Sequence, residues 1–340
     1  MKGISVIIPS YNSGKTIERC LKSVIETAYP DIEIIVVDDL STDNSPQIVE
    51  KLCQENPGII RLVRADKNAG PAKARNTGSG YAIKEYLFFL DSDTVMLPDA
   101  LHNFALSIEN ADAVTGVYHY EPLNPGIIQE YKALFNYYFF CRKGVIKYEV
   151  FDASRAGVKA EIFRAIGGFN ENLRWGMDYE NEEFGYRLTR KYKNLLDPSI
   201  MVKHVFPCFK KLTKTYFLRV SLWVEIFFHR RKFESGGVTS AETGISTASL
   251  LLAVMVLPFS LVHQSFYFIF LFFIFLYLYG YIGFLMFVFR KKGLFFILAI
   301  LVNIYFSFII GIAFLWGLMR IIFKKSDILE KSSKEAFSSI

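Results

Sequence analysis

Short, mostly apolar runs separated by amphipathic stretches organise the N-terminal third of the chain. Runs of this length are typical of strands that are buried on both faces of a parallel sheet. Between them, apolar residues recur at helical spacing, as at Ile17, Leu21 and Val24. This alternation predicts an α/β fold with a mostly parallel, doubly wound sheet, and Pro9 is expected to end the first strand. The predicted strands are Ile4–Ile8, Glu33–Val37, Ile59–Arg64, Tyr86–Leu90 and Ala113–Tyr118.

The pattern changes after residue 244, where charged residues nearly vanish and Phe, Leu and Ile dominate. Each of three apolar segments reaches the roughly 20 residues that a membrane-spanning helix needs. Arg290, Lys291 and Lys292 should lie on the cytoplasmic side. If all three segments cross, the lysines of the tail lie outside, against the positive-inside rule; a re-entrant segment is the alternative. The segments are Ile245–Val262, Phe266–Phe289 and Leu294–Phe323, after a linker at 234–244 and before a polar tail at 324–340.

Composition agrees with a soluble domain joined to a membrane domain, since 52% of residues are hydrophobic and 16% are aromatic. The net charge of +6 is modest, and its scattered basic residues suit membrane lipids better than a nucleic acid. The aromatic and basic stretch at 213–233 predicts a helix in the membrane interface, with a domain-covering core helix as the alternative. The four cysteines form no C-x-x-C pair, and the first apolar run is too short for a signal peptide. We therefore expect the soluble domain to be cytoplasmic.

Two carboxylates, Asp91 and Asp93, follow the Tyr86–Leu90 run directly. They fall at the carboxyl end of a predicted parallel strand, which is where open α/β sheets bind ligands. Their oxygens are ligands that Mg²⁺ or Mn²⁺ prefers, and such ions bridge substrate phosphates. A solvated turn is the alternative interpretation. The sequence therefore predicts a site for a divalent cation and a diphosphate.

Other polar residues follow neighbouring predicted strands and should converge on the same edge. Tyr11 could stack on a base, Asp39 could accept a hydrogen bond from a base or ribose, and the Arg75 guanidinium could hold phosphate. Tyr11 could instead cover the sheet edge, and Arg75 could be a surface residue that follows a helix cap. His204 is a candidate metal ligand, although a lone histidine is usually a structural hydrogen-bonding group.

An acidic segment at 178–188 is a candidate source of a general base. On a helix, Glu180, Glu183 and Arg187 would share one face. Neighbouring carboxylates raise each other's pKa, which is a usual way of preparing a base. Asp178 and Glu182 lie beside them in the sequence.

Five motifs together resemble family 2 glycosyltransferases in order and spacing. The resemblance implies a GT-A fold over residues 1–232, an inverting transfer from a nucleotide-diphosphate sugar, and Mg²⁺ or Mn²⁺ as cofactor. It places Pro9, Tyr11, Asp39, Arg75 and Asp91 at the donor, and Asp93, Asp91 and His204 at the metal. The motifs are Val6-Ile7-Ile8-Pro9-Ser10-Tyr11-Asn12, Val37-Asp38-Asp39-Leu40-Ser41-Thr42-Asp43, Asp91-Ser92-Asp93, Gly167-Gly168-Phe169-Asn170-Glu171 and Glu183-Phe184-Gly185-Tyr186-Arg187-Leu188.

The chain departs from the family pattern at Asn181, which stands where the base aspartate is expected. An amide cannot take up the proton, so we expect Glu180, then Asp178, to act as the base. The Gln-x-x-Arg-Trp signature of processive synthases is absent, which favours transfer of a single sugar. Combined with the apolar segments, the resemblance implies a multi-pass enzyme of the cell membrane with a lipid-linked or membrane-presented glycan acceptor. A sugar-nucleotide-binding scaffold with weak or no catalysis is the alternative.

Overall fold

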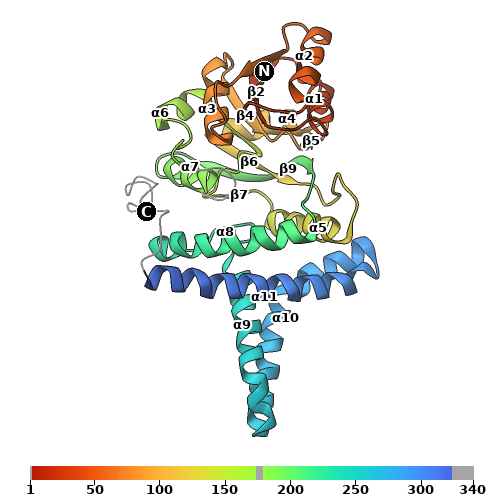
Figure 1. Ribbon diagram of the computed structural model, residues 1–340, viewed down its shortest axis with the longest axis vertical. Coiled ribbons are helices and arrows are strands. Elements are labelled where there is room, and N and C mark those ends of the chain that lie inside the picture. The colour runs from red at the N-terminus through yellow and green to blue at the C-terminus, as the bar shows by residue number, and fades with distance from the viewer. Residues whose placement is uncertain (1, 174–178, 324–340) are drawn as a thin grey trace. The chain divides into compact units, whose positions relative to one another are not determined.

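The computed structural model describes residues 2–173 and 179–323, which form two compact units (Figure 1). One unit contains the chain up to Leu123 together with Lys143–Val205. The other begins with Asn124–Arg142 and resumes at Phe206. The helix predicted at 213–233 therefore groups with the C-terminal helices, and the predicted domain boundary at residue 232 does not coincide with the boundary between these units.

The first unit is built on a mixed, mostly parallel sheet with helices on both faces, which confirms the predicted fold class. Its strand order is β3-β2-β1-β4-β8-β6-β9-β5, and β7 pairs with β9. β1 is parallel to β2 and β4, whereas β8 is antiparallel to β4 and β6. The strands are β1 Ile4–Ser10, β2 Ile32–Asp38, β3 Ile60–Arg64, β4 Tyr86–Leu90, β5 Thr94–Met96, β6 Ala113–Tyr118, β7 Ile146–Lys147, β8 Arg155–Lys159 and β9 Asn194–His204.

The strand predictions were right for β4 and β6 to the residue, but Pro9 does not end β1. The ladder to β4 ends at Ile7, while the ladder to β2 continues through Pro9 to Ser10. Proline lacks an N–H donor, and none is needed on the side where β4 no longer pairs. Pro9 is therefore part of the strand, and the loop begins at Tyr11.

Alternate residues of the central strands belong to two hydrophobic cores, one on each face of the sheet. Val6 and Phe88 belong to the core beneath α1 and α4, whereas Ile7 and Phe89 belong to the core beneath α3, α6 and α7. Burial on both faces explains why these strands read as continuous apolar runs. The helices of this unit are α1 Ile17–Glu26, α2 Ser45–Glu55, α3 Pro71–Tyr81, α4 Ala100–Ser107, α6 Ala160–Ile166 and α7 Glu180–Thr189, with a 3-10 turn at Ile108–Asn110.

The second unit is helical, and among the described residues three helical segments are long and apolar enough to cross a membrane. α9 and α10 form a hairpin whose two base ends are both tied to α5. Glu242 of α9 pairs with Arg142 at 2.6 Å, and Lys292 at the end of α10 pairs with Glu130 at 2.7 Å. The helices are α5 Ile127–Cys141, α8 Phe209–Arg230, α9 Ala241–Val256, α10 Gln264–Lys292 and α11 Phe295–Ile322, with a 3-10 turn at Leu257–Leu261.

Candidate functional site

The turn after β4 carries the first carboxylate, Asp91, at the carboxyl end of the strand. Thr94 donates both its backbone N–H (3.2 Å) and its hydroxyl (2.7 Å) to the Asp91 carbonyl, which fixes the turn. The Asp91 Oδ1 then accepts from Arg75 Nη2 at 2.9 Å. Arg75 also donates from Nη1 to Glu180 Oε1 at 3.4 Å. One buried guanidinium thus links the strand-end acid to the start of α7.

Arg75 lies beside Asp91, and its guanidinium is engaged by two carboxylates. Its side chain is 3% exposed, so this arginine is not a surface residue. Burial by itself would lower the pKa of Arg75, but the Asp91 and Glu180 carboxylates outweigh this effect and hold the pKa above its usual value. Burial also raises the pKa of Asp91, and Arg75 opposes that rise. Arg75 therefore neutralises and orients the acids, and its contact with a donor phosphate stays a prediction.

The second carboxylate, Asp93, faces His204. Pairing of β5 with β9 sets Thr94 opposite His204, and Val205 N–H donates to the Asp93 carbonyl at 3.2 Å. This brings His204 Nε2 to 3.4 Å from Asp93 Oδ1. Burial lowers the pKa of His204, although the Asp93 carboxylate acts in the opposite direction. The imidazole is therefore neutral near pH 7, as a metal ligand must be.

Asp93 and His204 are placed so that they could be the protein ligands of a divalent cation. The Asp93 side chain is 42% exposed, so its oxygens are accessible to an ion. Within residues 2–173 and 179–323, no cluster of three or more His, Cys, Asp or Glu side chains suits a metal. This pair resembles sites in which one or two carboxylates bind the ion and substrate phosphates and water complete its coordination. The Asp93 oxygens suit Mg²⁺ or Mn²⁺, whereas an imidazole is the less usual ligand for these two ions.

The loops after β1 and β2 are joined by Asn12. Its Oδ1 accepts from Thr42 N–H at 2.8 Å, and its N–H donates to Ser41 Oγ at 2.9 Å. Asn12 has φ of +50°, a conformation that asparagine tolerates better than most residues. Tyr11, its neighbour, is 46% exposed and is free to take a flat ligand on its ring. The clamp by Asn12 was not predicted, although the residue lies in the first motif.

Asp39 is buried beside these loops, and both its oxygens are held by the backbone. They accept from the N–H groups of Ala69 at 2.9 Å and Gly70 at 2.8 Å. Each carboxylate oxygen has a second lone pair, so acceptance from a base donor remains chemically open. Gly70 has φ of +86°, which allows the chain to turn its N–H toward Asp39 just before α3 begins.

A second polar cluster next to Asp91 was missed by the sequence analysis. Asp152 Oδ2 pairs with Arg155 Nη1 at 2.6 Å, and its Oδ1 accepts from Ser154 Oγ at 2.7 Å. The Ser154 carbonyl accepts from Asp91 N–H at 3.4 Å. Arg155 lies 3.8 Å above the Tyr118 ring, which in turn packs against the His204 ring at 4.7 Å. These residues support both halves of the site, and only the antiparallel pairing of β8 with β4 brings them there.

The acidic helix divides into a structural part and a part in the site. Glu183 makes a two-point ion pair with Arg187 at 2.7 and 2.8 Å, so they share one face as predicted. Arg187 also donates to the carbonyls of Ile166 and Gly168, which fixes the glycine turn. Glu180 is buried and reaches Arg75, while Asn181 Oδ1 accepts from Ala153 N–H at 3.4 Å. Asp178 lies outside the described residues.

Gly185 lets α7 pack closely on the segment that leads to Asp152. A methyl group there would lie 2.5 Å from both Glu149 O and Phe151 N, which are backbone atoms that cannot rotate away. Gly185→Ala should therefore lower the free energy of unfolding by about 1–3 kcal/mol, measured by chemical denaturation in detergent. Gly80→Ala is the matched control, because an added Cβ meets nothing within 4 Å there and alanine favours helix. Equal stability of Gly185→Ala and the wild type would contradict the close contact.

Comparisons with known proteins agree with the fold. Residues 5–167 match the family model described as glycosyl transferase family 2, which confirms the resemblance seen in the sequence. The chain is 34% identical over 118 residues to the glycosyltransferase GlyG of Streptococcus pneumoniae, covering 34% of this chain and 39% of that protein. It is 35% identical over 127 residues to the poly(ribitol-phosphate) beta-N-acetylglucosaminyltransferase TarP of Staphylococcus aureus, covering 36% and 38%. The matches thus span about two fifths of these curated relatives.

A solved structure shares the fold over nearly the whole chain. It is the mannosyltransferase PcManGT from Pyrobaculum calidifontis, in complex with GDP-Man and Mn²⁺. The likeness has a TM-score of 0.58 at 17% identity and covers 96% of this chain and 88% of that one. The structure therefore places this chain among proteins with a GT-A-like domain and C-terminal helices.

Proposed function

We propose that this chain, whose residues 5–167 match glycosyl transferase family 2, is a membrane-bound, inverting glycosyltransferase that moves one sugar per encounter from a nucleotide-diphosphate donor. The observation that carries this proposal is the pair of acids flanking the turn after β4. Asp91 is held by Arg75, and Asp93 lies 3.4 Å from His204, at the edge where the Tyr11 and Asp39 loops also meet. The same edge therefore offers an aromatic face, hydrogen-bond acceptors and ligands for an ion.

In this proposal the donor lies across the carboxyl ends of β1, β2 and β4. Tyr11 stacks on the base, Asp39 accepts from it, and Asp91 with Arg75 faces the ribose and diphosphate. Asp93 and His204 would hold Mg²⁺ or Mn²⁺, and such an ion stabilises negative charge on a departing diphosphate. A structural neighbour supports this donor class, since PcManGT was solved with GDP-Man and Mn²⁺.

The acceptor hydroxyl needs a base, for which we propose Glu180. Its carboxylate opens α7 and is joined through Arg75 to Asp91, so it lies at the same edge of the sheet as the proposed donor. An inverting transfer requires removal of the hydroxyl proton on the face opposite the leaving group, and a carboxylate can take it. Asp178 is the second candidate, two residues earlier in the sequence.

We further propose a lipid-linked or membrane-presented glycan acceptor in cell-envelope synthesis. The apolar helices of the second unit support a membrane location, and the relative TarP is a poly(ribitol-phosphate) beta-N-acetylglucosaminyltransferase. The alternative, a sugar-nucleotide-binding scaffold, is favoured by one observation. Asn181 replaces the expected acid and accepts a hydrogen bond from the Ala153 backbone, so it has a structural role.

A transfer assay tests the proposal. The full chain in native membrane lipids is incubated with a panel of radiolabelled UDP-, GDP- and dTDP-sugars and Mn²⁺, and both lipid-extractable label and free sugar are measured. One donor should give label in the lipid fraction. Specific donor binding without transfer or hydrolysis for any donor would support the scaffold instead.

The cytoplasmic location of the first unit gives a separate prediction. Residues 1–230 should be protected from protease in intact cells and digested in inside-out vesicles, because a cytosolic nucleotide sugar must reach the site. Immunoblotting against an N-terminal tag measures the protection. Digestion from outside the cell would overturn both the location and the use of a cytosolic donor.

A further inference from the structure

α11 has an exposed apolar face along its whole length. Six large side chains at helical spacing are each at least 37% exposed, and no charged residue occurs between Lys292 and Arg320. Monomeric soluble proteins rarely expose an apolar stripe this long, so a partner covers it. The six are Ile297, Leu301, Ile304, Ile312, Leu315 and Met319.

The opposite face of α11 is covered by α8, which lies alongside it for most of its length (Figure 1). Phe209 packs on Tyr305 with ring centroids 4.8 Å apart, and a methyl group at Gly317 would lie 2.9 Å from Val224 Cβ. From the first contact to the second, the residue number increases in both α8 and α11, so the two helices run in the same direction. α8 thus packs on the face of α11 opposite the apolar stripe and leaves the stripe exposed.

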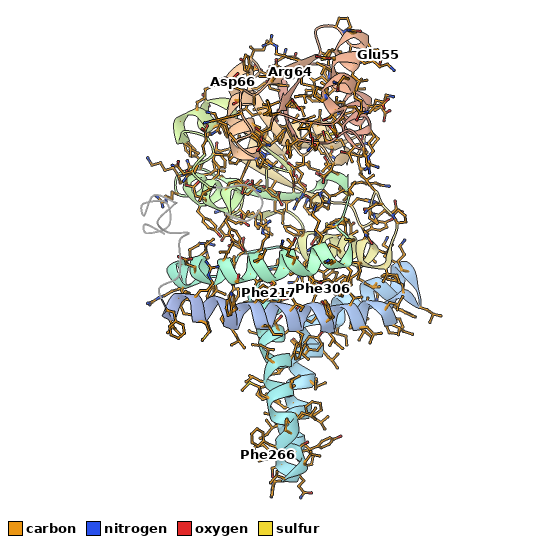
Figure 2. The ribbon with its side chains drawn as sticks, viewed as in Figure 1. Glu55, Arg64, Asp66, Phe217, Phe266 and Phe306 are labelled. Atoms are coloured by element: carbon orange, nitrogen blue, oxygen red, sulfur yellow. The ribbon has the colours of Figure 1, made fainter. Side chains whose placement is uncertain are left out.

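The α9–α10 hairpin contacts α11 differently, over a short stretch at its middle. Asn303 accepts from Tyr131 Oη at 2.6 Å and donates to Tyr277 Oη of α10 at 2.9 Å. Two turns further on, a methyl group at Gly311 would lie 2.5 Å from Leu251 of α9. Contacts limited to such a stretch mean that the helices cross steeply. Figure 1 shows the hairpin pointing away from α11, and Figure 2 marks Phe266 near its tip.

Helical geometry sets the hairpin and the stripe on neighbouring sides of α11. At 100° per residue, the two hairpin contacts, Gly311 and Asn303, lie about 40° and about 120° from Leu315, whereas Gly317, which meets α8, lies about 160° from Leu315. The stripe therefore faces the direction in which the hairpin leaves. The first helix of the hairpin, α9, and the 3-10 turn that follows it together span Ala241–Leu261. These 21 residues make about 30 Å of helix, which equals the hydrocarbon thickness of a bilayer.

We propose that only the α9–α10 hairpin crosses the membrane and that α11 lies flat on the bilayer, with its exposed stripe in the lipid. The partner of this surface is an anionic lipid bilayer. Its apolar face fits the acyl boundary, and the basic residues that bracket it, Arg290–Lys292 and Arg320, fit anionic headgroups. This arrangement replaces the three-span expectation. It also sets both ends of α11 on one side, which removes the conflict with the positive-inside rule.

Depth measurements with single tryptophans test this proposal on the full chain. Trp316 is 54% exposed on the flank of the stripe, and Trp175→Phe with Trp223→Phe leaves it as the single native tryptophan. Two further probes are Ile297→Trp and Ile304→Trp, each made in a chain in which Trp175, Trp223 and Trp316 are all replaced by Phe. The protein is reconstituted in phosphatidylethanolamine and phosphatidylglycerol vesicles that carry lipids brominated at defined acyl carbons. Quenching of each tryptophan then reports its depth.

The two probes on the stripe, Ile297→Trp and Ile304→Trp, should give the same shallow depth, about 5–10 Å below the headgroup boundary, and Trp316, about 100° from Leu315 around the helix, should be no deeper. Phe272→Trp, with the native tryptophans replaced, is the control on the exposed side of α10 and should be quenched near the bilayer centre. A spanning α11 would instead bury Ile304→Trp about 10 Å deeper than Ile297→Trp, since seven residues rise by that distance. That gradient, or the absence of quenching at all three α11 positions, would overturn the proposal. The variant that keeps Trp316 has no substitution in α11. Its depth can therefore be measured even if the variants with a new tryptophan in α11 misfold.

Discussion

Asp93→Ala should abolish sugar transfer while the protein remains folded. The carboxylate is 42% exposed and lies 3.4 Å from His204, so its removal takes away the accessible oxygen ligands of the proposed cation site. A bound metal contributes several kcal/mol to stabilising charge in the transition state, and each 1.4 kcal/mol corresponds to a tenfold change in rate. The expected loss is therefore at least about a hundredfold in kcat/KM, measured with the active donor at saturating Mn²⁺.

Chelation and a neighbouring variant separate the metal from other causes. EDTA should remove wild-type activity, and added Mn²⁺ should restore it. His204→Ala should raise the Mn²⁺ concentration needed for half-maximal rate without moving the denaturation midpoint far. Ser92→Ala is the matched control between the two acids, because the motif assigns no ligand role to Ser92. Full wild-type activity in EDTA would show that the acids do not act through a metal.

Glu180→Gln should lower transfer by about 10²–10⁴-fold, the usual contribution of a general base. The amide keeps the shape of the side chain but cannot accept the acceptor proton. Donor affinity, measured by calorimetry, should change little, because the donor contacts proposed for Tyr11, Asp39 and Asp91 are retained. The loss should therefore fall on kcat.

The structure adds a second way in which Glu180 could act, because its Oε1 lies 3.4 Å from Arg75 Nη1. If the carboxylate only positions Arg75, then Arg75→Lys should reproduce the loss of transfer, and both variants should weaken donor binding. If Glu180 is the base, Glu180→Gln lowers kcat and leaves donor binding unchanged.

Three further substitutions locate the base if Glu180 is not it. Asp178→Asn tests the second candidate, and Glu182→Gln tests the remaining acid of the segment. Loss of transfer in Asp178→Asn, with normal transfer in Glu180→Gln, assigns the base to Asp178. A sharp rise in Asn181→Asp would mean that the wild-type chain is a weakened enzyme, in favour of the scaffold alternative.

The sequence by itself determined the features that depend on neighbouring residues. Apolar runs buried on both faces predicted β4 and β6 to the residue, because a parallel strand is covered by helices on each side. The acids after β4 and the loops after β1 and β2 follow strand ends, so their convergence on one edge followed from the topology of parallel sheets. Length and lack of charge likewise identified the apolar helices.

Only the tertiary structure decided what depends on residues far apart in the chain. The antiparallel pairing of β8 with β4 brings Asp152 and Ser154 to Asp91, and the pairing of β5 with β9 brings His204 to Asp93. The sequence left Arg75 as either a phosphate-binding residue or a surface arginine, and the packing of α3 and α7 buries it between two carboxylates. The length of α11 permits a membrane span, whereas its side-on packing with α8 and its steep crossing with the hairpin come from contacts that no local pattern encodes.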